Sequence, residues 1–91
     1  MMKKIKMFIL PTCPYCVAAL RWMDELYAEN SSYRAIDIEI IDESANPEIA
    51  GQHDYYYVPT YYVGDKKAHE GAASLEKIRL VFDAALVACK A

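Results

Sequence analysis

The chain contains few residues that interrupt regular structure, with three glycines and four prolines among its 91 residues. Long apolar stretches are missing as well, since the run at residues 7–10 ends at Pro11. A run this short is neither a membrane span nor the apolar part of a secretory signal peptide. With 55% hydrophobic and 25% charged residues, the composition is also unlike that of a disordered or fibrous chain.

Positive charge is not in excess, because the formal net charge is -3 at pH 7. We therefore expect no general attraction to nucleic acid or to anionic membranes. Cysteine is scarce too: three residues, two of them in one Cys-X-X-Cys, do not make the disulfide framework of a secreted protein. The expected setting is the cytoplasm, and the length fits one domain over residues 1–91, acting as a monomer.

The run Cys13-Pro14-Tyr15-Cys16 carries the predicted chemistry. Residues three apart on a helix are neighbours, so the two thiols can form a disulfide or stay reduced. Pro14 suits the first position of a helix, which places Cys13 at the N-terminal cap and Cys16 one turn inside. Unpaired N–H groups and the positive end of the helix dipole stabilise a thiolate at the cap. We therefore expect Cys13 to be the nucleophile and Cys16 the resolving thiol.

A zinc site and two incidental core cysteines are the alternatives for this pair. A closed zinc site needs four ligands, and the remaining candidates, Cys89, His53 and His69, are not paired at ligand spacing. The sequence therefore favours a redox pair without a metal. Cys89 falls on the apolar face expected for the last helix, where it is either a small core hydrophobe or a regulatory thiol.

Hydrophobic patterning predicts alternating strands and helices. Residues 4–10 are apolar near their end, as in a strand buried on both faces, and residues 33–41 alternate Ile36, Ile38 and Ile40 with acidic residues, which predicts one buried face. Strand, helix and strand in succession imply a right-handed parallel crossover. The expected strands are residues 4–10, 33–41, 58–63 and 66–70, and the expected helices are residues 14–29, a short one within 42–54, and a last one capped by Ser74.

Tyrosine is concentrated near the centre of the chain, in Tyr55-Tyr56-Tyr57 and Tyr61-Tyr62. Tyrosine offers apolar area with a polar tip, so these rings are suited to an aromatic rim for a peptide or thiol substrate beside Pro59. They are equally suited to filling a sheet, because tyrosine is a good strand former. Both interpretations remain open at this point.

Residues 8–16, the Val58-Pro59 pair and the last helix preceded by Gly71 resemble the dithiol glutaredoxins of the thioredoxin superfamily. The resemblance implies a thioredoxin-like, glutaredoxin-type α/β fold in three layers, with a four-stranded mixed sheet flanked by helices. It implies a cis bond before Pro59, which lies against the active-site disulfide, and a main-chain contact from Val58 to the substrate. It assigns active-site support to Thr12, Pro14 and Tyr15, and substrate binding to Tyr57, Gly71, Ala73 and Ser74.

The implied activity is that of a thiol–disulfide oxidoreductase without a bound metal or organic cofactor. Its substrates are disulfide-bonded proteins or glutathione mixed disulfides, and its electrons come from glutathione as co-substrate or from a flavin reductase. Two positions differ from the family pattern. Leu10 stands where many glutaredoxins carry a lysine that meets glutathione, and the run Gly71-Ala72-Ala73-Ser74 lacks the usual acid. We therefore expect weaker glutathione binding.

Two alternatives share the same fold. One is a thioredoxin-like electron donor dedicated to a single partner enzyme. The other is a non-catalytic binding module, such as an iron–sulfur carrier with Cys13 and glutathione as ligands. Pro14 disfavours the carrier, because the resemblance suggests a smaller residue at this position in cluster-binding relatives.

Overall fold

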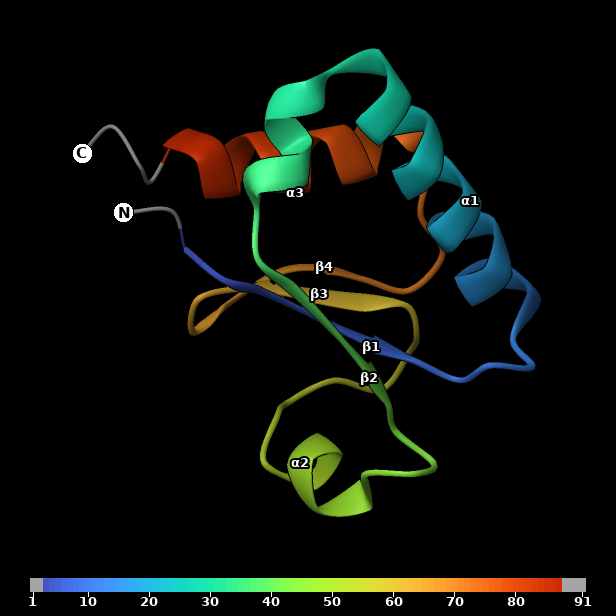
Figure 1. Ribbon diagram of the computed structural model, residues 1–91. Helices are drawn as coiled ribbons and strands as arrows, with labels where there is room; N and C mark the ends of the chain where they lie inside the picture. Colours follow the sequence, from blue (N-terminus) through green and yellow to red (C-terminus); the bar gives the residue numbers. More distant parts are fainter. Residues whose placement is uncertain (1–2, 88–91) are drawn as a thin grey trace.

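A four-stranded mixed sheet with helices on both faces forms the centre of the protein (Figure 1). The computed structural model describes residues 3–87. The strands are β1 (Ile5–Ile9), β2 (Ile38–Asp42), β3 (Thr60–Val63) and β4 (Lys66–Glu70). The helices are α1 (Pro14–Glu29), α2 (Pro47–Gly51), α3 (Leu75–Val87) and the short 3-10 helix η1 (Ser31–Ala35). This order confirms the expected α/β fold.

The sheet has the order β2-β1-β3-β4, so β1 lies inside it and β2 and β4 are its edges. β1 pairs in parallel with β2 and antiparallel with β3, and β3 pairs antiparallel with β4. Helices α1 and α3 cover one face and α2 covers the other (Figure 1). Along β1, Met7 packs into the core under α1 and α3, while Phe8 packs with Ile41 and Tyr62 on the α2 side. The prediction of a first strand buried on both faces is confirmed.

The second predicted strand, residues 33–41, was wrong over its first half. The Asn30 side chain accepts a hydrogen bond from Ser32 N–H at 3.0 Å, which opens η1, and the strand begins only at Ile38. Of the predicted buried face, Ile36 is 6% exposed and Ile38 is partly buried against the core, but the prediction was wrong at Ile40, which is 48% exposed. Its neighbour Ile41 is 3% exposed instead. The alternation assumed one buried face, but β2 has helices on both sides and lies at the edge of the sheet.

The remaining boundaries lie close to those predicted. The third strand is shorter than expected, since residues 58 and 59 form a bend before Thr60. Ser74 caps α3, because its Oγ accepts a hydrogen bond from Lys77 N–H at 3.2 Å. Ile78 and Phe82 are fully buried on the predicted apolar face, whereas Cys89 lies outside the described residues. Among residues 3–87, no helix is long and apolar enough to cross a membrane.

Candidate active site

The two cysteines of the motif lie where β1 ends and α1 begins, as predicted. Cys13 N–H bonds to Leu10 O at 3.0 Å, which turns the chain out of the strand. Cys13 has extended backbone angles and is the N-cap of α1, and Pro14 starts the first helical turn. The carbonyl of Cys13 accepts hydrogen bonds from Cys16 N–H at 3.0 Å and Val17 N–H at 3.1 Å. The two thiols are therefore one helical turn apart, and both are free.

The environment of Cys13 favours its thiolate. The pKa of Cys13 lies below its ordinary value, chiefly because the backbone N–H of Cys16 stabilises the charged sulfur. Partial burial raises the pKa of Cys13, whereas the backbone N–H of Tyr15 lowers it further. The prediction that the helix start activates Cys13 is confirmed in direction and in cause.

Cys16 has the opposite character. It is 1% exposed, and burial raises the pKa of its thiol to about 11. Hydrogen bonding to Cys13 and the negative charges of Cys13 and Glu43 raise that pKa further, although the Leu10 backbone lowers it. The pair therefore combines a thiol that ionises more readily than usual, at Cys13, with a buried thiol at Cys16 that stays protonated at neutral pH.

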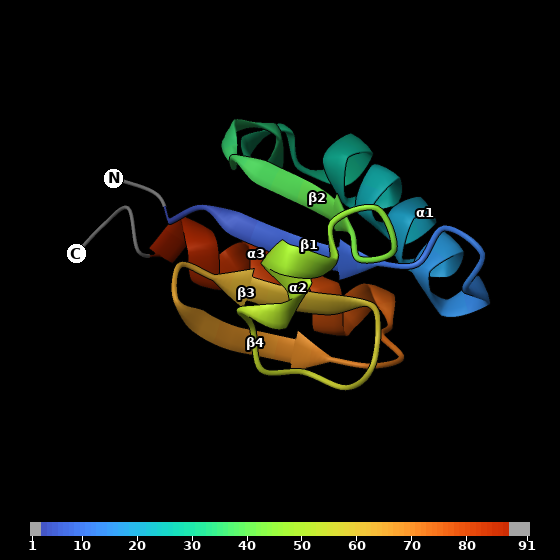
Figure 2. The ribbon, with the colours of Figure 1, turned by 90° about the horizontal axis from the view of Figure 1, so that it is seen from below.

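The loop before β3 and the turn after β4 bring the other expected residues to the same end of the sheet (Figure 2). The Val58–Pro59 bond is cis, as expected, and Pro59 is fully buried. Gly71 N–H bonds to Pro59 O at 2.9 Å, which joins the two segments. Gly71 has a φ of +90°, which favours glycine, and a Cβ there would lie 3.7 Å from Tyr57 Cβ.

Cys13, Val58 and Ala73 are partly buried and pack against one apolar cluster, whose members include Cys16. The structure thus brings the N-terminus of α1, the residue before Pro59 and the approach to α3 onto a common core. Thr12 and Pro14 are exposed beside Cys13, and Ser74 has the capping role described above.

The tyrosines divide into two groups, one that fills the sheet and one that is exposed on a loop. Tyr61 is fully buried and Tyr62 is 7% exposed, and they fill opposite faces of the sheet. Tyr57 is 70% exposed and Tyr56 is 86% exposed in the loop before Pro59. Tyr15, within the cysteine motif, is 61% exposed. Aromatic surface is therefore available on the segments that carry Cys13 and Pro59.

Two acidic residues near this end of the sheet were missed in the sequence. Glu43 follows β2, where its N–H bonds to Ile9 O at 3.0 Å and its carboxylate accepts a hydrogen bond from Tyr55 OH at 2.9 Å. Glu70, at the end of β4, bonds to the loop before Pro59. No local signal marks either role, because the partners are 12 to 14 residues away along the chain.

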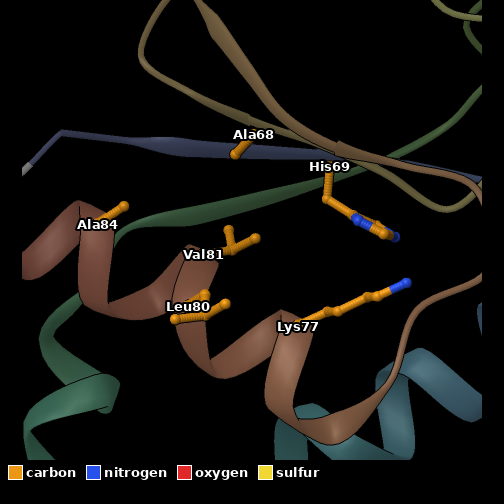
Figure 3. A pocket seen from close by; sticks show the side chains of 6 residues that line it. All are labelled: Ala68, His69, Lys77, Leu80, Val81 and Ala84. Atoms are coloured by element: carbon orange, nitrogen blue, oxygen red, sulfur yellow. The ribbon is translucent and has the colours of Figure 1, made fainter.

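A separate cavity of about 280 Å³ lies between β4 and α3 (Figure 3). It is lined from β4 by Ala68 and His69 and from α3 by Lys77, Leu80, Val81 and Ala84. None of the expected redox residues lines this cavity. Within residues 3–87, no group of three or more His, Cys, Asp or Glu side chains is placed to hold a metal ion.

The mixed sheet, the cysteine pair at the start of α1 and the cis proline at the same end of the sheet define the class of thioredoxin-like proteins. A family model described as a thioredoxin domain matches residues 3–83 of this chain. The chain therefore belongs to the thioredoxin-domain family.

Relatives of similar length support this membership. Thioredoxin from Methanocaldococcus jannaschii is 32% identical over 75 residues, covering 82% of this chain and 86% of the relative. A probable thioredoxin from Methanothermobacter thermautotrophicus is 33% identical over 78 residues, covering 86% and 89%. The resemblance to glutaredoxins is thus confirmed at the level of the superfamily, while the named relatives are thioredoxins.

Solved structures show the same fold. Thioredoxin 1 from Thermosipho africanus matches with a TM-score of 0.58 at 24% identity, covering 89% of this chain and 96% of that one. An uncharacterised thioredoxin-like protein from Clostridium perfringens matches with a TM-score of 0.66 at 25% identity, covering 92% of this chain and 71% of that one.

Proposed function

We propose that this protein is a thiol–disulfide oxidoreductase that reduces disulfide bonds in other proteins. The observation that carries the proposal is the opposite shift of two thiol pKa values one helical turn apart, downward at Cys13 and upward at Cys16. A thiolate is the attacking species in disulfide exchange, and a buried thiol that stays protonated does not compete with it.

The reaction proceeds in two exchanges. The Cys13 thiolate attacks one sulfur of the substrate disulfide, forms a mixed disulfide and releases the other sulfur as a thiolate. Cys16 then gives up its proton to solvent or to the released thiolate and attacks the Cys13 sulfur, which releases the second substrate thiolate. Two electrons have then passed from the protein dithiol to the substrate, and the protein holds a Cys13–Cys16 disulfide.

The substrate chain is proposed to lie along Val58. Within residues 3–87, neither the N–H nor the C=O of Val58 takes part in a backbone hydrogen bond. Such groups can pair with the main chain of an extended polypeptide, as when a strand is added to a sheet edge. The exposed rings of Tyr15 and Tyr57 would flank that chain and contribute apolar contact.

The other expected substrate contacts are supporting ones. Gly71 keeps the space beside Tyr57 open, since it carries no side chain there. Ala73 and Ser74 form the approach to α3, and Thr12 and Pro14 form the surface next to Cys13. All of them are proposed to shape the rim around the reacting sulfur rather than to take part in the exchange.

Two electron donors suit the oxidised protein, namely glutathione and a flavin-dependent thioredoxin reductase. We propose the reductase, because the relatives above 30% identity are named thioredoxins. The half-buried, uncharged Leu10 and the absence of an acid in the run 71–74 support the same choice, since both positions lack a charged contact for glutathione. A cytoplasmic location would supply either donor.

Insulin reduction in dithiothreitol tests the activity. Wild-type protein should accelerate the precipitation of free insulin chains, Cys13→Ser should abolish the acceleration, and Cys16→Ser should leave at most a small part of it. Retained activity in Cys13→Ser would contradict the mechanism.

The electron donor is tested by following NADPH consumption after adding either thioredoxin reductase, or glutathione with glutathione reductase, to the oxidised protein. Faster turnover with glutathione would overturn the proposed donor.

A further inference from the structure

The carboxylate of Glu70 holds the loop that precedes the cis proline. Its Oε2 accepts hydrogen bonds from two consecutive backbone groups, Tyr56 N–H at 2.6 Å and Tyr57 N–H at 3.0 Å. Its Oε1 accepts a hydrogen bond from Lys67 Nζ at 2.6 Å, within an ion pair in which the Glu70 side chain is 19% exposed. One side chain at the end of β4 therefore anchors a segment 13 to 14 residues earlier in the chain.

Further hydrogen bonds hold the loop on both sides of these two N–H groups, through the carbonyls of Asp54 and Tyr57. The carbonyl of Asp54 accepts from Tyr62 OH at 2.8 Å and from Lys67 Nζ at 3.2 Å. The carbonyl of Tyr57 accepts from the Thr60 hydroxyl. Every bond in this set belongs to residues 54–57 of the loop, and the next residue, Val58, takes part in no backbone hydrogen bond within residues 3–87.

We propose that Glu70 is a positioning residue that holds the Tyr56-Tyr57 segment in place so that Val58 and the exposed tyrosine rings are presented to a polypeptide substrate. This inference rests on the proposed function, in which the substrate main chain pairs with Val58. It extends that function by placing the control of substrate affinity on β4, away from the cysteines.

An anionic acceptor suits this position. Two donors converge on one oxygen and an ammonium group meets the other, so a carboxylate satisfies all three partners. The Lys67 ammonium and the Tyr56 backbone N–H lower the pKa of Glu70 to about 2. The anchor is therefore charged throughout the pH range in which disulfide exchange is measured.

The Tyr56-Tyr57 segment has little side-chain packing of its own. Tyr56 and Tyr57 are 86% and 70% exposed, so their side chains contribute little packing. Without the carboxylate, the segment would have to be ordered each time a substrate binds, and ordering an interface segment reduces affinity. The chemistry at Cys13 would be unaffected, because its pKa is set by the start of α1.

The test compares Glu70→Ala and Glu70→Gln with the matched control Glu76→Ala, which removes an exposed acid on α3 whose carboxylate bonds, within residues 3–87, only to Arg79. Steady-state insulin reduction gives KM and kcat, and oxidation of the reduced protein by hydroxyethyl disulfide reports the chemistry alone. For Glu70→Ala we expect KM for insulin to rise roughly tenfold, with kcat and the small-disulfide rate within about twofold of wild type.

Glu70→Gln keeps one acceptor oxygen for the loop and should give a smaller rise in KM. Amide hydrogen exchange over residues 54–58 supplies a second measurement, in which Glu70→Ala loses protection and Glu76→Ala does not. An unchanged KM in Glu70→Ala, or an equal loss of rate toward the small disulfide, would overturn the proposal. Failure of wild-type protein to reduce either disulfide would instead overturn the proposed oxidoreductase function.

Discussion

The unequal thiols predict strongly selective alkylation of the reduced protein. At pH 7, a thiol with the pKa of about 11 found at Cys16 is ionised in roughly one molecule in ten thousand. A thiol at its ordinary pKa of 9.0 is ionised in about one molecule in a hundred, and Cys13 lies below that pKa. Because iodoacetamide reacts with thiolates, and the thiolate of the lower-pKa thiol is the weaker nucleophile, Cys13 should react at least ~10-fold faster than Cys16. The 1% exposure of Cys16 widens the difference.

The assay is a time course of iodoacetamide modification at pH 7, quenched with acid and resolved by mass spectrometry of the intact protein and its peptides. The peptide that carries Cys13 should be modified rapidly, before Cys16. In the Cys13→Ser variant, Cys16 should remain unmodified over the same period, because it stays buried. Comparable rates at the two cysteines, or first modification of Cys16, would refute the assignment of nucleophile and resolving thiol.

Three further predictions concern the mixed disulfide at Cys13, the ionisation of Cys16 and the core packing of Phe82. Cys16→Ser should accumulate a mixed disulfide through Cys13 with insulin chains, seen on non-reducing gels and removed by dithiothreitol. The reduced protein should lose about 2 to 3 kcal/mol of unfolding free energy between pH 9 and 11, relative to Cys16→Ser, because the unfolded thiol ionises near 9.0 and the folded one near 11. Urea titrations at each pH measure this difference. Phe82→Ala should cost ~3 to 5 kcal/mol in the same titrations, since Phe82 is fully buried against Tyr27 and Tyr33.

The features that were predicted correctly depend on residues that lie close together in the sequence. The cap at Cys13, the first-turn proline and the position of Cys16 one turn inside the helix all follow from four adjacent residues and the geometry of one helical turn. The burial of β1 on both faces follows from an unbroken apolar run. In each case the physical cause lies within a few residues of its effect.

The errors arose where distant elements decide the outcome. Residues 33–41 alternate as a strand does, yet Tyr33 is held in η1 by its OH bond of 2.6 Å to Asp83, 50 residues away on α3. Ile41 is buried because α2 and the loop after it cover that face of the sheet with Ile49 and Tyr55. Tertiary packing overrides local pattern in both places.

The resemblance to glutaredoxins rested on the Cys13-to-Cys16 run, the Val58-Pro59 pair and Gly71. In the proposed function these residues position the reacting sulfur and the segment that meets the substrate, which does not separate thioredoxins from glutaredoxins. Under the same proposal, partner choice depends on surfaces such as the Tyr56-Tyr57 loop, which is anchored from β4. Reactivity is set at the start of α1 by bonds that do not involve this loop. Substitutions in the loop should therefore change which disulfides are reduced without changing how readily Cys13 attacks them.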